Sequence, residues 1–386
     1  GYGPEVINEL LSWEKTTELN FGLDFGFFNG RLSGTIDWYN KTSKDLLMDQ
    51  KLLLEQGSPT GTMTANVGKV RNSGIELMLK GVLLQTKNFY WDVTATFAKN
   101  KNEILELQGK KEDMRAERWF IGQPIDVAYD LRQTGICTQA TANEKVTIDG
   151  VTKTKSEWYG YFEGCMTYED INKDGKIDDS DRQIIGQAMP KWTGTLSTSF
   201  SYKNWDFSMS VNTKQGHTLY SPFMQEFTDY SDRGRTKLKM DFYIPEGAPV
   251  FNYTWDGSNP SSLTSDRTVV AGQTHVGSYP YPLNDVNYNH GGGNGWYTGK
   301  NTEFKSNNYV DASYWKIKNI TLGYTFDKQL TKKIGIEHLR IYANVLNPFT
   351  FTDYKGFDPE WADAAILDGT GGPSSISYQI GLNVKF

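Results

Sequence analysis

The stretch Ser375-Ile-Ser-Tyr-Gln-Ile-Gly-Leu-Asn-Val-Lys-Phe386 ends the chain and alternates without a break between apolar residues and polar or small ones. Successive side chains of a β-strand point to opposite faces, so this pattern predicts a strand with one apolar face and one polar face. About 9–11 residues of tilted strand cross a bilayer, and the stretch has that length. Taken alone, it fits a membrane-spanning strand as well as the edge strand of a soluble β-sandwich.

The same alternation recurs along the chain, which favours the membrane interpretation. Eight further segments show it, at residues 18–27, 31–38, 75–80, 89–97, 192–202, 205–212, 320–326 and 339–345. Asn29-Gly30 predicts a two-residue hairpin turn, and Lys203 a one-residue turn. Between Tyr309 and Ile320 the apolar residues change face, so we expect either a β-bulge or an extension of the strand above the membrane there.

The composition fits a sheet with one wet face. Hydrophobic residues make up 38% of the 386 residues and aromatic residues 14%. No run of about 18 apolar residues exists, which excludes a transmembrane helix. A polar average with many aromatic residues is typical of a membrane barrel, because every second strand residue faces the lumen. A soluble all-β protein has a similar composition.

The lengths of the connections distinguish these two classes. Short turns near residues 29, 86, 203 and 328–335 alternate with long connections at 101–190, 216–308 and 353–373. Membrane barrels have short periplasmic turns and long extracellular loops, whereas soluble domains rarely carry two loops of such length. The sequence therefore predicts an all-β fold, with about nine antiparallel strands of a transmembrane β-barrel and a chain that ends at the periplasmic face.

Residues 170–181, inside the first long loop, match an EF-hand-like calcium loop. Positions 1, 3, 5, 7, 9 and 12 are Asp170, Asn172, Asp174, Lys176, Asp178 and Asp181. Lys176 would offer its backbone carbonyl, and Gly175 permits the sharp turn at position 6. Asp181 replaces the usual Glu and shortens the bidentate arm. We expect a structural calcium ion that staples the loop, and the alternative is a metal-free surface turn.

Other candidate chemistry is sparse. Cys137 and Cys165 lie in the same loop, where an exported protein can form a disulfide, and the alternative is two free thiols. The four histidines lack metal spacing, and no nucleophile motif or phosphate loop is present. A net charge of −6 argues against nucleic-acid binding. We therefore predict that the chain is not an enzyme.

Several short segments match the motifs of one known family: Trp13-Glu14, Asn20-Phe-Gly-Leu-Asp24, Asn66-Val-Gly-Lys-Val-Arg-Asn-Ser-Gly-Ile-Glu76, Ile121-Gly-Gln-Pro-Ile125, residues 170–182 with Ile185-Gly186 and Pro190, Tyr314-Trp-Lys-Ile-Lys-Asn-Ile-Thr-Leu-Gly-Tyr324, Asn347-Pro-Phe-Thr-Phe-Thr-Asp353 and Gly356-Phe-Asp-Pro-Glu360. Through these segments the chain resembles the C-terminal part of SusC/RagA-type TonB-linked outer-membrane transporters of Bacteroidota. The order and spacing of the segments together are specific. Gly372-Pro373-Ser374 replaces the Tyr-Pro segment that the family usually carries before its last strand.

The resemblance implies a larger protein around this chain. Barrels of this class have 22 strands and a plugged lumen. The expected signal peptide, TonB-contacting segment and plug domain are absent, and about nine strands cannot close such a barrel in lipid. The resemblance therefore identifies residues 1–386 as the C-terminal part of a barrel in the outer membrane of a Gram-negative bacterium. Phe386 becomes the terminal aromatic residue that resembles the signal for barrel assembly.

The resemblance also implies active import of glycan oligosaccharides or peptides. A SusD-like surface lipoprotein would capture the substrate and TonB would supply the energy. Five aromatic residues of the long loops are candidates for contact with the substrate or the lid, unless they only pack the loop: Trp255, Tyr281, Tyr288, Trp296 and Tyr297. Two alternatives stay open. One is a siderophore or cobalamin receptor of the TonB-dependent class, and the other is a secreted soluble calcium-binding β-protein that binds carbohydrate.

Overall fold

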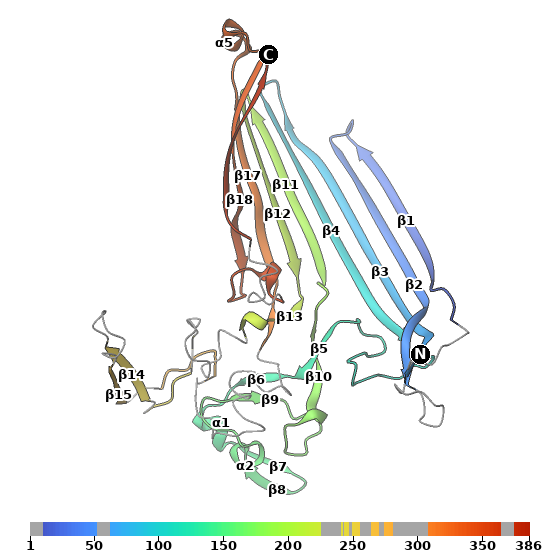
Figure 1. Cartoon of the computed structure of the whole chain (residues 1–386), viewed down its shortest axis with the longest axis vertical. Helices are drawn as coiled ribbons and strands as arrows, with labels where there is room; N and C mark the ends of the chain where they lie inside the picture. The colour runs from blue at the N-terminus through green and yellow to red at the C-terminus, as the bar shows by residue number, and fades with distance from the viewer. Residues whose placement is uncertain are drawn as a thin grey trace, which may run out of the picture.

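The computed structural model describes residues 11–51, 62–224, 241, 243–246, 249–254, 264–269, 274–280, 308–363 and 374–386. Its main element is a nine-stranded sheet, in which consecutive strands of the sheet follow chain order (Figure 1). The strands are β1 (Lys15–Phe27), β2 (Leu32–Lys51), β3 (Thr62–Gln85), β4 (Phe89–Glu106), β11 (Trp192–Tyr202), β12 (Trp205–Gln215), β17 (Tyr314–Thr325), β18 (His338–Thr352) and β19 (Ser377–Lys385). All neighbours pair antiparallel, which confirms the predicted fold class.

Short and long connections lie at opposite ends of the sheet, as predicted (Figure 1). We name these the turn end and the loop end. The turn end holds the short connections and the C-terminus, and Asn29 and Gly30 both have the positive φ that a type I′ turn needs. One detail was wrong: because Tyr202 pairs with Trp205, the turn at Lys203 has two residues and not one.

The register separates the two faces of the sheet in rows. One row runs across β1 to β4 and is apolar: Leu23, Ile36, Leu77 and Phe97. The adjacent row runs across β1 to β12 and is mostly polar: Asp24, Thr35, Met78, Thr96, Thr195 and Asn212. A barrel in lipid requires this separation, with the apolar face toward the acyl chains and the polar face toward the lumen.

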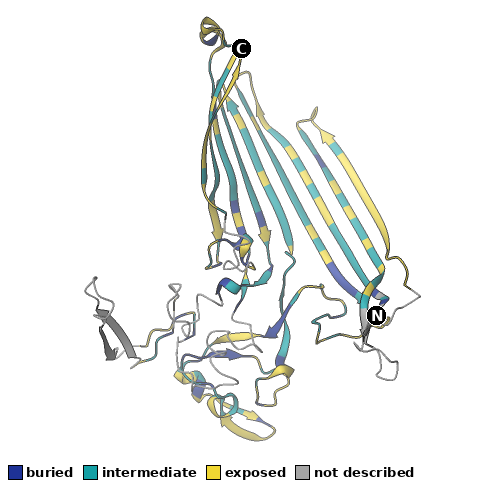
Figure 2. Ribbon diagram, in the orientation of Figure 1, coloured by how far each residue is buried: buried dark blue, intermediate teal, exposed yellow. Residues whose placement is uncertain are grey.

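The burial of apolar residues is inverted relative to a soluble protein. Large apolar side chains of the strands, such as Phe21, Leu196 and Ile380, are exposed. Most buried apolar residues lie in the connections at the loop end, where dark blue segments gather in Figure 2. Monomeric soluble proteins rarely expose apolar patches of this extent, so the strand surface is suited to contact with lipid.

Aromatic side chains mark two levels on the apolar face. Near the loop end Trp192 contacts both Phe97 and Trp315. Near the turn end Phe89 contacts Phe200 and Tyr202. Trp192 and Tyr202 delimit β11. The ten steps from one to the other, at about 3.3 Å each and tilted by about 40°, cover roughly 25 Å of height. This matches the aromatic girdles that border the apolar band of a membrane barrel.

The expected bulge lies in β17. The register shifts between Ile317 and Asn319 on the β18 side and between Ser210 and Val211 on the β12 side. Lys316 pairs with Asn212 and Asn319 pairs with Ser210, and both of these β12 residues face the polar side of the sheet. The bulge therefore returns the polar residues of β17 to the polar face after the alternation changes phase.

The loop end carries small units of its own. The strand pairs are β5 (Val127–Leu131) with β10 (Arg182–Gln187), β6 (Gln133–Ile136) with β9 (Met166–Tyr168), β7 (Lys145–Ile148) with β8 (Val151–Thr154), β13 (Thr218–Tyr220) with β16 (Tyr309–Asp311) and β14 (Pro249–Thr254) with β15 (Thr264–Val269). Short helices are α1 (Gln139–Asn143) and α2 (Lys155–Tyr159), with 3-10 turns at Asp179–Asp181 and Pro359–Trp361. At the turn end, α5 (Lys328–Thr331) continues into a 3-10 turn at Lys332–Ile334. Among the described residues, no helix is long and apolar enough to cross a bilayer.

Gly74 lies where the neighbouring strands leave no space for a larger side chain. A Cβ at this position would meet the backbone oxygen of Lys99 and the hydroxyl of Tyr39, both at 2.6 Å. We expect Gly74→Ala to lower the free energy of unfolding by about 1–3 kcal/mol through overpacking. The measurement is the temperature at which the barrel of the full-length protein loses its compact electrophoretic migration. Gly26→Ala is the control, because nothing lies within 4 Å of a Cβ there; equal midpoints for both variants would contradict the packing.

Candidate functional site

The loop at residues 170–181 folds as a tight turn around its first residue. The carboxylate of Asp170 accepts the backbone N–H groups of Lys173 at 2.6 Å and Gly175 at 3.0 Å. Both of these residues have positive φ, 59° and 80°. Gly175 is required for space as well, since a Cβ there would meet the ring of Trp158 at 2.4 Å. Sequence reasoning placed this turn correctly.

The last residue of the loop fastens it to the first. Asp181 is fully buried and accepts the backbone N–H groups of Ile171 at 2.9 Å and Asp178 at 3.0 Å. Asp178 in turn accepts the backbone N–H and the hydroxyl of Ser180, and these hydrogen bonds lower the pKa of the Asp178 carboxyl. The loop is therefore closed by carboxylates that bind its own backbone.

The oxygen-rich donor set suits calcium, but the side chains do not converge. In the part of the chain that the structure describes, no three His, Cys, Asp or Glu side chains gather closely enough to hold a metal ion. The Asn172 amide instead donates to Asp174 at 3.1 Å and to the Ser180 hydroxyl at 2.8 Å. Calcium would need Asn172 and Asp174 to turn their oxygens inward, so the ion stays a prediction.

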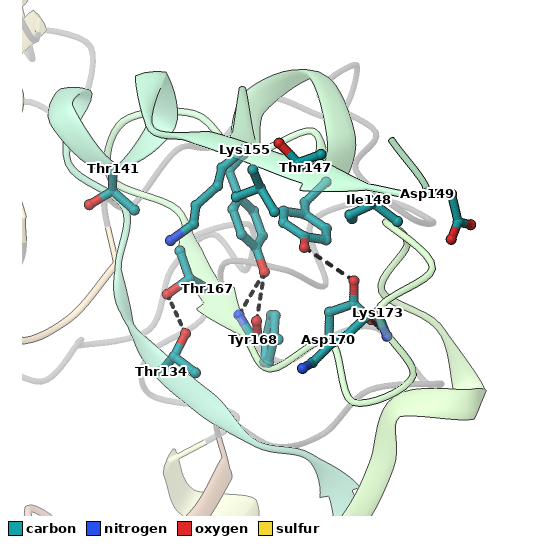
Figure 3. A pocket seen from close by; sticks show the side chains of 13 residues that line it. Thr134, Thr141, Thr147, Ile148, Asp149, Lys155, Thr167, Tyr168, Asp170 and Lys173 are labelled. Carbon is teal, nitrogen blue, oxygen red and sulfur yellow. Dashed lines mark hydrogen bonds between the residues drawn. The ribbon is translucent and has the colours of Figure 1, made fainter. Parts of the chain in front are cut away.

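A cleft of about 600 Å³ lies beside this loop (Figure 3). Its walls come from α1, α2, the β7–β8 hairpin, β6, β9 and the start of the loop. Tyr159 donates its hydroxyl to Asp170 at 3.1 Å, so one wall is bonded to the loop. Burial, followed by the charge of Asp170, raises the pKa of Tyr159 to about 12, so its hydroxyl stays protonated. The volume is in the usual range for small-molecule sites.

The two cysteines occupy the core behind the cleft. Cys137 and Cys165 are both buried and belong to one apolar cluster with Leu131, Met166 and Tyr168. The backbone N–H of Cys137 donates to the carbonyl of Cys165 at 2.8 Å. The structure therefore brings the two predicted partners together with their thiols free.

The predicted aromatic contact residues lie outside the described residues: Trp255, Tyr281, Tyr288, Trp296 and Tyr297. The described part of the same loop contains an aromatic contact that sequence reasoning missed. Tyr243 is buried and donates its hydroxyl to Glu163 at 2.7 Å. This bond joins the second long loop to the first, and no periodicity or motif in the sequence marks it.

Sequence reasoning also missed an ion cluster on the polar face of β17. The ammonium of Lys316, only 1% exposed, lies 2.8 Å from Asp358 and 2.6 Å from Glu360. Lys318 lies 2.7 Å from Glu360, and Tyr314 donates its hydroxyl to Glu360 at 3.0 Å. The cluster holds the connection between β18 and β19 against the polar face. A hollow of about 580 Å³, lined in part by Glu360, lies on the same face.

The cluster predicts different roles for two neighbouring lysines. Lys316→Met leaves two carboxylates near each other without their buried cation, and we expect a cost of about 3–5 kcal/mol to the attachment of residues 353–363. Lys318→Met is the control, because its side chain is 30% exposed and such pairs contribute about 0–1 kcal/mol. Hydrogen exchange of residues 353–363 in the full-length protein measures the effect. Equal protection in both variants would contradict it.

The cluster also predicts acid sensitivity. Burial raises the pKa of Glu360, but the hydrogen bonds from Lys316, Lys318 and Tyr314 outweigh it and lower the value from 4.5 to about 2. Because the pKa of Glu360 is lower in the folded than in the unfolded protein, its ionised carboxylate stabilises the fold. This stabilisation is fully present above pH 4.5, the pKa of the unfolded state, and is lost as the pH falls toward 2. The rate of hydrogen exchange of residues 353–363, corrected for its intrinsic pH dependence, should rise between pH 4.5 and pH 2. The variant Glu360→Gln should lack most of this rise. If its pH profile equals that of the wild type, groups other than Glu360 cause the rise.

Comparison with known proteins gives the family. The family described as TonB dependent receptor-like, beta-barrel matches residues 1–237. The TonB-dependent receptor SusC of Bacteroides thetaiotaomicron is 28% identical over 409 residues, which cover 99% of this chain and 33% of that protein. The TonB-dependent receptor P39 of Formosa agariphila is 27% identical over 424 residues, covering 100% of this chain and 37% of that protein.

Solved structures show the same fold. The structure of the RagAB peptide transporter matches with a TM-score of 0.62 at 24% identity, over 97% of this chain and 36% of that one. The RagAB peptide importer in the 'open-open' state matches with a TM-score of 0.63 at 24% identity, over 97% of this chain and 35% of that one. This chain spans about a third of the length of the curated relatives it matches. The chain therefore belongs to the TonB-dependent receptor family, as part of an outer-membrane β-barrel of the SusC/RagA type.

Proposed function

We propose that the protein containing this chain imports oligomeric nutrients, peptides or glycan oligosaccharides, across the outer membrane with energy supplied through TonB. The observation that carries the proposal is the separation of faces in the sheet. Exposed apolar rows suit lipid, and the polar rows line a lumen that a polar cargo can pass. The membership in a receptor family also agrees with the prediction that the chain is not an enzyme.

The substrate class rests on the type of relative. The RagAB structures are named as a peptide transporter and a peptide importer, and SusC is named only as a TonB-dependent receptor. Peptides are therefore the first class to test and glycans the second. The soluble carbohydrate-binding alternative is wrong, because the family match identifies an outer-membrane barrel. The siderophore or cobalamin alternative differs from the proposal in the size and chemistry of its cargo.

A SusD-like surface lipoprotein is the proposed partner at the loop end. A lipoprotein that covers the loop end needs a rigid docking surface. The described loops are linked to each other in several places. Tyr243 bonds to Glu163, and Arg118 donates to the hydroxyl of Tyr309 at 3.1 Å. These contacts support a connected platform made from both long loops. The remaining barrel strands and the plug are proposed to belong to the same full-length protein, since β1 and β19 are the edges of this sheet and edges in lipid need partners.

Deletion of the gene in its own organism tests the transport proposal. We expect loss of growth on a defined peptide mixture or on a defined glycan panel as carbon source, with normal growth on free amino acids and monosaccharides. Cells that lack TonB should show the same defect. Purification of the complex, followed by mass spectrometry, should recover a surface lipoprotein together with the cargo. Loss of growth only under iron or cobalamin limitation would instead support the siderophore or cobalamin alternative.

We also propose that residues 170–181 bind a structural calcium ion, on the strength of the oxygen ligands at EF-hand spacing and the positive φ of Gly175. Calcium at 100 times its dissociation constant should stabilise the loop by about 2.7 kcal/mol. The full-length protein should therefore resist cleavage within 170–181 in calcium but not in EGTA.

Replacing both Asp170 and Asp174 with Ala should abolish that difference. Asp149→Asn, at the exposed hairpin tip of β7 and β8, is the matched control. Identical cleavage of the wild-type protein in calcium and in EGTA would remove the ion from the proposal.

A further inference from the structure

Cys137 and Cys165 lie next to the last pair of an antiparallel ladder. That pair is Ile136 of β6 with Met166 of β9, and extending the register by one residue brings Cys137 opposite Cys165. The backbone N–H of Cys137 donates to the carbonyl of Cys165 at 2.8 Å, and Gly164 donates to the carbonyl of Cys137 at 2.7 Å. Opposed residues in such a ladder have Cα atoms roughly 4.5–5.5 Å apart, within the range that a disulfide requires.

The side chains share one enclosed space. Cys137 is 0% exposed and Cys165 is 2% exposed, and both pack in the apolar cluster behind the cleft. The Cys137 thiol donates to the carbonyl of Thr138 at 3.4 Å, and the Cys165 sulfur accepts the backbone N–H of Phe162 at 3.4 Å. The interaction between the two side chains lowers the pKa of Cys137 and raises the pKa of Cys165.

We propose that Cys137 and Cys165 form an intramolecular disulfide in the exported protein, and that this bond fixes the two walls of the cleft relative to each other. An outer-membrane protein passes through the periplasm, where disulfides form and persist. The geometry of the ladder and the shared core carry the proposal, independently of any substrate.

The chemistry is a thiol–disulfide exchange with an oxidised dithiol protein of the periplasm. The thiolate of one cysteine attacks the disulfide of that oxidant and forms a mixed disulfide. The thiolate of the other cysteine then attacks the protein's sulfur in this mixed disulfide, displaces the oxidant's thiolate and forms the bond between Cys137 and Cys165. The pair loses two electrons and two protons, and the oxidant gains them as a dithiol. Since both sulfurs are buried in the folded unit, the exchange precedes its final packing.

The position of the bond gives it a structural consequence. It closes the segment 138–164, which contains α1, β7, β8 and α2. Thr147 and Lys155 line the cleft from inside this segment, whereas Thr167 and Asp170 line it from beyond Cys165 (Figure 3). Without the bond, side-chain hydrogen bonds such as those from Tyr159 to Asp170 and from Tyr161 to the carbonyl of Tyr168 join the two walls. With it, the two ends of the closed segment are also held together covalently, five residues before the loop at 170–181 begins.

Mass spectrometry of the full-length protein from native outer membranes tests the bond itself. The protein is denatured and alkylated with N-ethylmaleimide before any reduction, and then digested. We expect a linked pair of peptides containing Cys137 and Cys165 with neither thiol alkylated, and two alkylated thiols after reduction. Alkylation of both thiols without reduction, or linkage of either cysteine to another partner, would overturn the proposal.

Limited proteolysis tests the effect on the cleft. In the double variant Cys137→Ala/Cys165→Ala we expect cleavage within 138–164 to accelerate on the order of 100-fold, the effect of opening a closed loop of this length. Compact migration of the barrel should be unchanged. Wild-type protein produced under excess reductant keeps both side chains without the bond and should match the double variant. If it resists cleavage as well as the oxidised protein does, the bond does not fix the cleft.

Discussion

The bilayer leaves the backbone no water to bond with, and the rest of this structure depends on that constraint. Every N–H and C=O group at membrane depth must find a partner in a neighbouring strand. The inner strands of the sheet meet this demand in the simplest way, each pairing antiparallel with the strand before it and the strand after it, whereas the edge strands β1 and β19 each pair on one side. The alternation of side chains then follows, because the faces of a sheet in this setting contact two different solvents. The exposed apolar side chains of the strands are the direct result.

The loop end obeys the opposite rule, since water surrounds it. Its residues build small apolar cores and bury their polar groups in pairs, such as Tyr243 with Glu163 and Lys316 with Asp358. Two segments that carried the family resemblance, 314–324 and 356–360, are joined in space by the ion cluster around Lys316. The family signature in this region therefore corresponds to a physical attachment of an outer connection to the barrel wall.

Much of the barrel could be predicted because its signals are local. Period-2 alternation identified all nine strands, and a phase change in the alternation identified the bulge of β17. The turn at Lys203 was predicted one residue too short, because the alternation does not show whether Asn204 belongs to the turn or to the next strand. The pairing of Tyr202 with Trp205 assigns Asn204 to the turn. In the candidate site, the turn around Asp170 and Gly175 was found for the same reason: its hydrogen bonds join residues at most a few positions apart.

Sequence alone thus determined the fold class, the order of the strands, and the presence of a tight acidic turn, since each depends on neighbours along the chain. The strands extend further toward the loop end than the alternation predicted, as β3 does over Thr62–Gln85 against the predicted 75–80. The tertiary structure decided what distant segments do to one another. Lys316 meets Asp358 across 42 residues, and Cys137 meets Cys165 only because β6 and β9 pair in one register. Composition and periodicity do not predict these long-range contacts, because the contacts depend on the folded path of whole loops and on which charged groups are desolvated in the folded state.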